Sequence, residues 1–154
     1  MSATPTPNSL QEPVFEGQVG APFTYKDAAG NVMTVSLIGV TYAPQGTADQ
    51  SPGIGYRFVG AKFKIVGISG TSSGDANSDA SLIPVLSDTQ TYRPDSSGVI
   101  TGCSNFNGGS YMVTAGQTSI GCVVFKGPWD DRWARIEWRA GAGGTPATWY
   151  LPNM

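Results

Sequence analysis

The stretch YRFVGAKFKIVGIS, residues 56–69, is the longest strand candidate in the chain. Apolar side chains occupy every second position of its middle part, at Val59, Ala61, Phe63 and Ile65. Lys62 and Lys64 lie between them. Because successive side chains of a β-strand point to opposite faces of a sheet, this alternation predicts one buried face and one solvated face. We therefore expect a long antiparallel strand here.

The same period of two continues on both sides of this stretch. Residues 32–42 are rich in β-branched side chains, and their alternation changes phase near Leu37 and Ile38, which predicts a bulge. Residues 27–31 contain a glycine and predict a hairpin loop after a strand at 23–26. Further strands are expected at 81–87, 118–126, 134–139 and 148–151. Pro84 demotes the first of these to a sheet edge or a bulge, and 118–126, apolar on both faces, predicts a central strand.

These strand candidates and the turns between them decide the fold class. No segment predicts an amphipathic helix longer than about two turns. We predict an all-β protein, an immunoglobulin-like (Ig-like) antiparallel β-sandwich of about seven to nine strands. The side chains expected to face inward are Val35, Phe63, Ile65, Val124, Ile136, Trp138 and Trp149.

The first residues, MSATPTPNS, form a Pro/Thr/Ser tract. Such a tract buries little and cannot continue a helix, so we predict a flexible tether over residues 1–13 and one domain over residues 14–154. Tethers of this kind follow a removed signal sequence or a lipid-modified cysteine in a precursor, and the alternative is an ordinary frayed terminus. No transmembrane segment and no signal peptide is expected within the chain.

The composition excludes several functions. The chain has 154 residues and no histidine, which removes Ser-His-Asp and Cys-His catalysis, the usual zinc sites and haem ligation by histidine. Lys and Arg total 9 against 11 Asp and Glu, a formal net charge of -2. Nucleic acid binding needs clustered basic side chains, so we expect no nucleic acid partner. No cofactor is predicted either.

Cys103 and Cys122 are the two cysteines of the chain, and neither belongs to a CxxC motif. One intramolecular disulfide is therefore the predicted pairing, and a pair of buried free thiols is the alternative. The bridge would contribute roughly 3 kcal/mol to stability by restricting the unfolded chain. Few charged residues and a Thr/Pro-rich start suit an extracellular or cell-surface-tethered domain, where disulfides persist.

Asp75, Asn77 and Asp79 have the alternating oxygen side chains of a calcium-binding loop. They do not form an EF-hand, because Ala80 replaces the required glycine and Leu86 stands where the final glutamate would be. A surface Ca²⁺ site at these three residues is one interpretation, and a solvated loop is the other.

Trp129 and Trp133 flank Asp130 and Asp131 in a segment that predicts a loop after Pro128. Paired carboxylates between aromatic rings are typical of glycosidases and sugar-binding sites. Neighbouring residues of a strand point in opposite directions, however, and a structural turn explains both aspartates. We expect the two tryptophans to be exposed and to form a contact patch for a partner.

Residues 115–128, AGQTSIGCVVFKGP, resemble the Gly-x-Thr and Gly-Cys-Val-Val-Phe strand of an uncharacterised family of Ig-like secreted proteins and lipoproteins. These occur in actinobacteria and other Gram-positive bacteria, and the mycobacterial immunoprotective secreted antigen has a similar sandwich. Residues 33–37, MTVSL, match an earlier strand of that family, and the likeness extends over about residues 15–151. It implies a β-sandwich with a second cysteine upstream, which fits Cys103, and implies almost nothing about activity.

Together these features predict a non-enzymatic secreted or cell-surface-tethered domain that acts through contacts with a protein or an envelope component. The alternative is a small-ligand or carbohydrate-binding module that uses the loop tryptophans. A third hypothesis is a metal-dependent or unusual enzyme, which a concave pocket lined by carboxylates would favour.

Overall fold

The computed structural model describes residues 15–42, 56–84, 91–95, 100, 102–128, 133–139 and 146–151. Within these ranges lie β1 (Phe15–Gln18), β2 (Pro22–Lys26), β3 (Val32–Tyr42), β4 (Tyr56–Ser69), β5 (Thr71–Asp75), α1 (Ala76–Asp79), β6 (Ala80–Pro84), β7 (Ser110–Thr114), β8 (Thr118–Pro128), β9 (Trp133–Trp138) and β10 (Ala147–Tyr150). The all-β prediction is confirmed. No helix in these ranges is long and apolar enough to cross a membrane.

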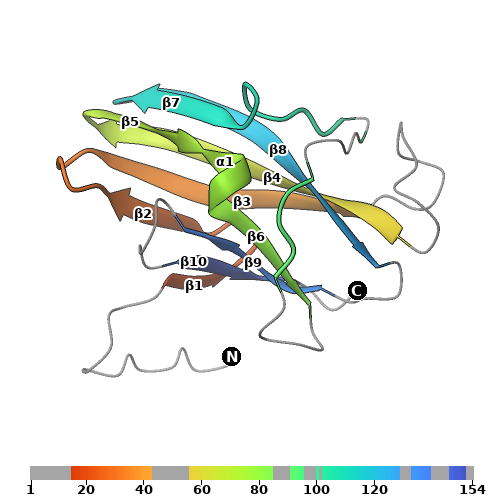
Figure 1. Cartoon of the computed structure of the whole chain (residues 1–154). Helices are drawn as coiled ribbons and strands as arrows, with labels where there is room; N and C mark the ends of the chain where they lie inside the picture. Colours follow the sequence, from red (N-terminus) through yellow and green to blue (C-terminus); the bar gives the residue numbers. More distant parts are fainter. Residues whose placement is uncertain are drawn as a thin grey trace.

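Two four-stranded sheets form the layers of a β-sandwich (Figure 1). One has the strand order β2-β3-β4-β8 and is antiparallel throughout. The other has the order β1-β10-β9-β6, and β1 pairs with β10 in parallel. β5 and β7 add a two-stranded antiparallel ribbon. β1, β5 and β7 are short strands that the sequence pattern does not predict, so the described part alone holds more strands than expected.

The β2–β3 hairpin and the β3–β4 pair follow the predicted pattern. Asp27 closes the hairpin loop by accepting hydrogen bonds from the backbone N–H groups of Ala29 and Asn31, each at 2.9 Å. Gly30 has φ +87°, a conformation that glycine adopts without steric cost. The register with β4 shifts between Leu37 and Gly39, as expected for a bulge.

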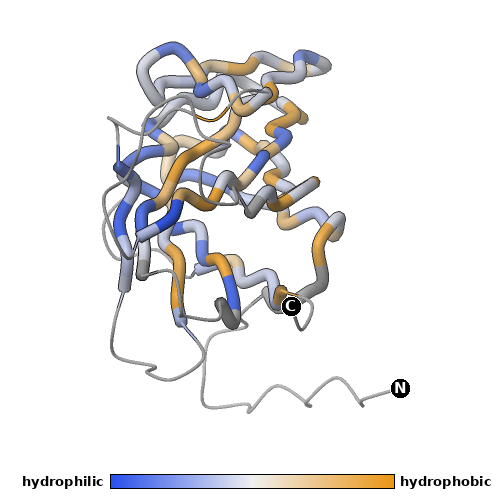
Figure 2. The backbone as a smooth tube through the Cα atoms, turned by 90° about the vertical axis from the view of Figure 1, so that its right-hand side faces the viewer, coloured by the Kyte–Doolittle hydropathy of each residue, from blue (hydrophilic) through white to orange (hydrophobic). Residues whose placement is uncertain are grey.

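The main core lies between the two four-stranded sheets, and Figure 2 shows hydrophobic residues interspersed with hydrophilic ones along the strands. Phe63 of β4 packs across the layers, with ring centroids 4.8 Å from Trp138 and 5.9 Å from Trp149. All three are fully buried. The indole N–H of Trp149 donates to the carbonyl oxygen of Ala21 at 2.7 Å, so this buried polar atom keeps a partner. The inward prediction also holds for Val35, Ile65 and Ile136.

The inward prediction for Val124 is wrong. Val123 is paired with Ala61 and faces the main core, so Val124 points to the opposite face of β8. There it belongs to a second apolar cluster with Phe58 and Ile100. Because β8 is apolar on both faces, its sequence pattern could not show which face belongs to the main core.

The prediction that β8 is a central strand is also wrong, because β8 ends the strand order of its sheet. Its apolar outer face has a different cause. Residues 94–104 run along its free edge, with hydrogen bonds from Asp95 N to Val124 O and from Cys122 N to Ser104 O, both at 2.8 Å. The covering segment buries a strand that would otherwise face solvent. β6 is the edge strand that Pro84 predicts, and its register shifts at that proline.

Candidate functional site

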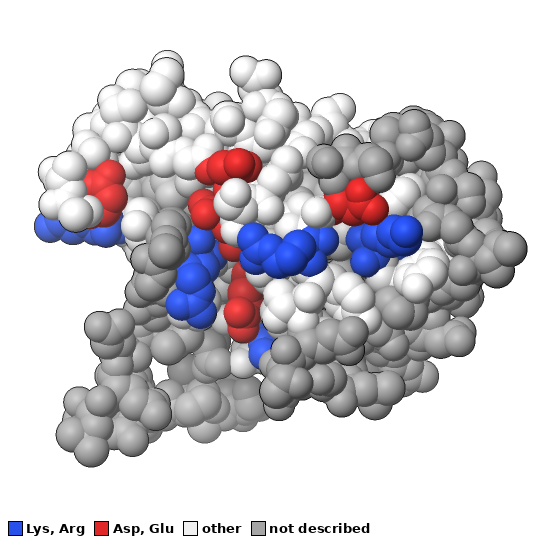
Figure 3. Space-filling model, in the orientation of Figure 1, with Lys and Arg blue, Asp and Glu red and all other residues white. Residues whose placement is uncertain are grey.

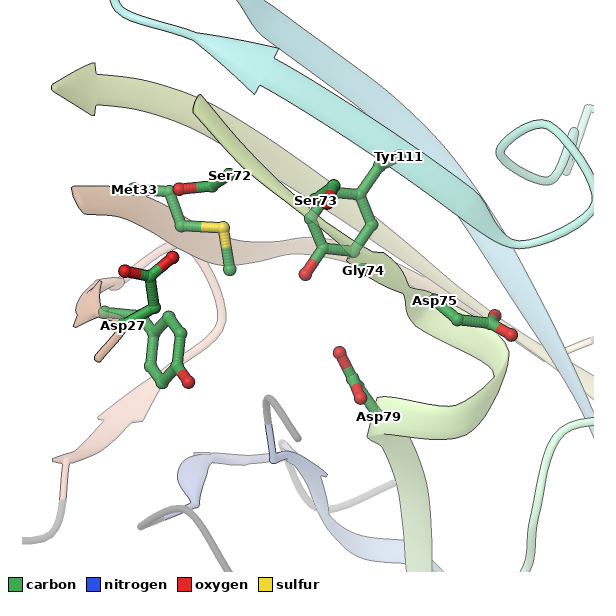
Figure 4. Close-up of a pocket in the computed structure, with 9 residues that line it drawn as sticks. Asp27, Met33, Ser72, Ser73, Gly74, Asp75, Asp79 and Tyr111 are labelled. Atoms are coloured by element: carbon green, nitrogen blue, oxygen red, sulfur yellow. The ribbon is translucent and has the colours of Figure 1, made fainter. Parts of the chain in front are cut away.

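A cleft of about 300 Å³ opens between the β2–β3 hairpin on one side and β5, α1 and β7 on the other (Figure 4). Its lining is mostly polar and combines carboxylates, phenols, hydroxyls and one thioether: Tyr25, Asp27, Met33, Ser72, Ser73, Gly74, Asp75, Asp79 and Tyr111. These residues come from four elements and two loops that are far apart in the sequence. Only the tertiary structure brings them together.

The single turn of α1 orients the first wall. Asp75 caps the turn, because its Oδ1 accepts from the N–H of Asn77 at 2.9 Å and its Oδ2 accepts from the hydroxyl of Ser78 at 3.3 Å. The N–H of Ala76 donates to the carbonyl of Gly109 at 2.7 Å. This turn buries Ala76 and Asp79 on its inner side, so the carboxylate of Asp79 points into the cleft while that of Asp75 points away from it (Figure 4).

Tyr111 of β7 forms the roof of the cleft. Its ring lies over Gly74, where a Cβ atom would be 2.5 Å from the phenol oxygen, so the absence of a side chain at this position makes room for the tyrosine. The hydroxyl of Tyr111 and the carboxylate of Asp79 point into the same space (Figure 4). Burial, followed by the negative charge of Asp79, raises the pKa of Tyr111 well above its usual range. This phenol is therefore protonated at neutral pH and can donate a hydrogen bond.

The opposite wall comes from the hairpin. The side chain and backbone amides of Asn31 donate to Asp27 and lower the pKa of its carboxyl, which is therefore ionised at neutral pH. Tyr25 and Met33 are cross-strand partners in β2 and β3, and Met33 is fully buried below the carboxylate. Asp27 and Asp79 thus stand on opposite sides of the cleft, and the thioether of Met33 lies between them (Figure 4).

The charge of the cleft is local. Its lining contains three aspartates and no lysine or arginine. On the face drawn in Figure 3, by contrast, acidic and basic side chains are interspersed. Arg93 lies beyond α1 and is held by the hydroxyl of Ser81 at 2.6 Å and by the carbonyl of Ser78. In the part of the chain that the structure describes, no group of three or more Cys, Asp or Glu side chains is arranged to hold a metal ion.

The three residues of the calcium-loop pattern have separate roles in the fold. Asp75 caps α1, and Asn77 accepts a hydrogen bond from the side-chain amide of Asn105 at 3.1 Å. Asp79 is 9% exposed and borders the cleft. Its side chain and that of Asp75 point in different directions (Figure 4), so the Ca²⁺ interpretation stays a prediction without a shared cavity of oxygens behind it.

Cys103 and Cys122 form the predicted disulfide, with their Cα atoms 5.0 Å apart. The bridge lies against Gly60 of β4, on the outer face of that sheet and among the second apolar cluster. Trp129, Asp130 and Asp131 lie outside the described residues. Trp133, for which the sequence predicts a loop, is instead the first residue of β9 and pairs with Pro84. Its role in partner contact stays a prediction.

Sequence reasoning did not identify the cleft residues Tyr25, Asp27, Met33 and Tyr111. One signal was present: the alternation in residues 23–26 and 32–42 could have placed Tyr25 beside Met33. Nothing in the local sequence indicates that β7 and the turn after β5 meet this hairpin, since that contact depends on the packing of the β5–β7 ribbon.

Comparison with known proteins supports the fold. No protein-family model matches the chain, and no curated protein matches its sequence. Similar solved structures include MPT63, a secreted protein of Mycobacterium tuberculosis, with a TM-score of 0.63 and 17% identity over 91% of this chain and 99% of that chain. A predicted lipoprotein of Bacillus subtilis has a TM-score of 0.57 and 9% identity over 79% of this chain and 36% of that one.

An uncharacterised β-sandwich protein of Clostridium difficile has a TM-score of 0.54 and 8% identity, over 94% of this chain and 99% of that one. At these identities the likeness shows a shared fold. It confirms the resemblance in fold to secreted β-sandwich proteins that the strand motifs indicate.

Proposed function

We propose that this protein is a non-catalytic extracellular domain, secreted or tethered to the cell surface, and that it acts by holding a small ligand in the cleft. The cleft itself carries the proposal. Its volume of about 300 Å³ is at the lower end of the range of small-molecule sites. Strands fix most of its lining, and polar side chains from both walls converge on one space, as they do in many binding sites.

The protonation states in the cleft favour binding over catalysis. General acid-base work at neutral pH needs a group whose pKa lies near the working pH. The pKa of Tyr111 is raised and that of Asp27 is lowered, so both move away from neutrality. The chain has no histidine to fill the gap. These side chains are suited to hold fixed charges and a fixed hydrogen-bond donor.

An extracellular location is supported by two observations. The disulfide between Cys103 and Cys122 is a cross-link that persists in oxidising compartments. The similar folds also include a secreted protein and a predicted lipoprotein. A precursor segment with a lipid anchor would make the domain a surface-tethered one.

A second candidate function is contact with a protein or an envelope component. Exposed apolar side chains favour it: Ile68 is 51% exposed, Met112 68% and Ile120 51%. They lie on β4, β7 and β8, outside the lining of the cleft. Residues of this kind at a surface are typical of contact regions when they form a continuous patch.

The test of the small-ligand function is amide chemical-shift mapping of the whole protein against a panel of cationic, neutral and anionic metabolites. We expect at least one compound to shift the amides of Ser72, Asp79 and Tyr111. Two variants that fill the cleft, Ser72→Leu and Ser73→Phe, should abolish these shifts, provided that circular dichroism shows a native fold. A panel without any response at the cleft, or shifts that persist in both folded variants, would refute the proposal.

A further inference from the structure

We propose that the cleft selects an organic dication, a ligand with two ammonium groups joined by a short aliphatic chain, as in linear diamines and polyamines. This inference rests on the proposed small-ligand function and names its ligand class. The feature that carries it is the separation of Asp27 and Asp79 across one small, largely polar cleft with an apolar side chain between them.

The first step of the argument concerns charge. Asp27, Asp75 and Asp79 line the cleft, and no basic side chain is among the lining residues. A cleft walled by protein of low dielectric constant focuses such a field and favours a cationic occupant. The same charges would repel a carboxylate or a phosphate. Asp79 matters most, because it is 9% exposed and its attraction is less screened than that of an exposed carboxylate.

The second step concerns the two ends of the ligand. Asp27 already accepts three hydrogen bonds, two at Oδ1 and one from the side chain of Asn31 at Oδ2. An ionised carboxylate has about four acceptor positions, so one remains at Oδ2 for an ammonium group. Asp79 offers a second anchor on the other wall (Figure 4). A ligand with one positive charge can satisfy one wall, whereas a dication satisfies both.

The third step concerns the middle of the ligand. Met33 and the rings of Tyr25 and Tyr111 line the same space as the two carboxylates. A thioether and aromatic faces contact methylene groups well, and an aromatic face also attracts an ammonium group. The protonated hydroxyl of Tyr111 stays neutral beside Asp79, so it adds no competing positive charge.

The arrangement does not suit an inorganic divalent ion. A calcium ion takes six to eight oxygen ligands at about 2.3–2.6 Å, which requires several oxygen atoms around one point. Here Asp27 and Asp79 stand on opposite walls, and the carboxylate of Asp75 points away from the cleft while it caps α1 (Figure 4). No group of three acidic side chains within the described ranges can hold a metal ion.

The test is isothermal titration calorimetry of the whole chain at an ionic strength of about 0.15 M, at which charges farther apart than about 8 Å are largely screened. The probes are linear diamines from diaminopropane to diaminohexane, with pentylamine, pentanediol, glutarate and calcium chloride as comparisons. We expect one diamine length to bind best, because the two carboxylates hold fixed positions. Pentylamine should bind about tenfold more weakly, and the diol and glutarate should give no heat.

Three variants assign the anchors. Asp79→Asn should weaken the best diamine about tenfold or more. Asp27→Asn keeps an acceptor for the hairpin loop and should reduce the affinity of the diamine to that of pentylamine, with little change for pentylamine itself. Asp75→Asn is the matched control: it removes the same charge, keeps a good helix cap and should change the affinity less than threefold.

The outcomes separate this inference from the function on which it rests. Binding of the diol, glutarate or Ca²⁺ at the cleft, with silent diamines, would overturn the dication and leave the small-ligand function standing. Equal affinities of pentylamine and every diamine would overturn it too, as would equal effects of Asp79→Asn and Asp75→Asn. If none of these probes binds while the metabolite panel shifts the amides of the cleft, only the dication is refuted.

Discussion

At the scale of single residues, two glycines shape the sandwich by leaving space for aromatic rings. Gly74 lies under Tyr111 at the cleft. Gly121 of β8 lies under Phe106, where a Cβ atom would be 2.4 Å from a ring carbon. Both rings belong to the main core and approach each other with centroids 5.9 Å apart. Glycine in a strand commonly marks such a close approach.

Gly121→Ala should therefore destabilise the protein by about 1–3 kcal/mol, because the ring of Phe106 must move inside a packed core. Gly39→Ala is the matched control, since a Cβ atom there would meet nothing within 4 Å. We expect the control to change the free energy of unfolding by less than about 0.5 kcal/mol. Denaturant unfolding measures both, and equal costs would contradict the packing described for Phe106.

Tyr111 gives a prediction about alkaline pH. Its pKa is raised in the folded protein, so above the ordinary tyrosine value of about 10 the unfolded chain loses this proton first. Stability is then complete below that pH and falls as the pH rises, by up to about 1.4 kcal/mol per pH unit from this one group. In Tyr111→Phe the free energy of unfolding should fall less steeply between pH 10 and pH 11 than in the parent protein. Identical slopes in urea titrations would contradict the burial of this phenol.

At the scale of elements, the segment before β7 acts as a cover for β8. It carries Ile100 and Cys103, which pack with Phe58 and Val124 on the outer face of the sheet. The disulfide fixes this cover at one point, and the hydrogen bond from Cys122 N to Ser104 O fixes it at another. An exposed edge strand is an aggregation hazard, so a cover of this kind has a clear physical benefit.

The disulfide gives a prediction at this scale. The unreduced protein should show no reactive thiol either in the native state or in denaturant, and two after reduction. Replacing both cysteines by serine should lower stability by roughly 3 kcal/mol, the loop-closure value for a sequence separation of 19 residues. Labelling of two thiols before reduction would show that the bridge does not form in the protein.

At the scale of the whole molecule, aromatic packing joins the two layers. Phe63 comes from β4, whereas Trp138 and Trp149 come from β9 and β10 of the opposite sheet. The contact therefore links segments whose local pairing cannot fix how the layers are stacked. Large side chains in such an interface contribute through buried area and ring geometry.

Phe63→Ala should cost about 3–5 kcal/mol, because it leaves a cavity between the layers. Ile120→Ala serves as the control, since Ile120 is 51% exposed on the outer face of β8. Its cost should stay within about 0.5 kcal/mol. A cost below about 1 kcal/mol for Phe63→Ala in chemical denaturation would contradict its position in the core.

The sequence by itself determined the elements with a clear period of two. It predicted the inward faces of β4 and β9, the bulge after Leu37, the hairpin loop at Asp27 and the edge position of β6. Each of these follows from side-chain alternation or from the backbone preference of Gly or Pro, which are local properties. The pairing of two isolated cysteines also needed no tertiary information beyond an oxidising environment.

The tertiary structure alone decided which face of β8 meets the core, because a strand that is apolar on both sides has no local signal of direction. It also decided the candidate site. Tyr25 and Asp27 are more than eighty positions from Tyr111 in the sequence, and no periodicity connects them. Their carboxylate and phenol groups share a cleft because the β5–β7 ribbon and the turn of α1 pack against the β2–β3 hairpin, a long-range arrangement that local preferences do not encode.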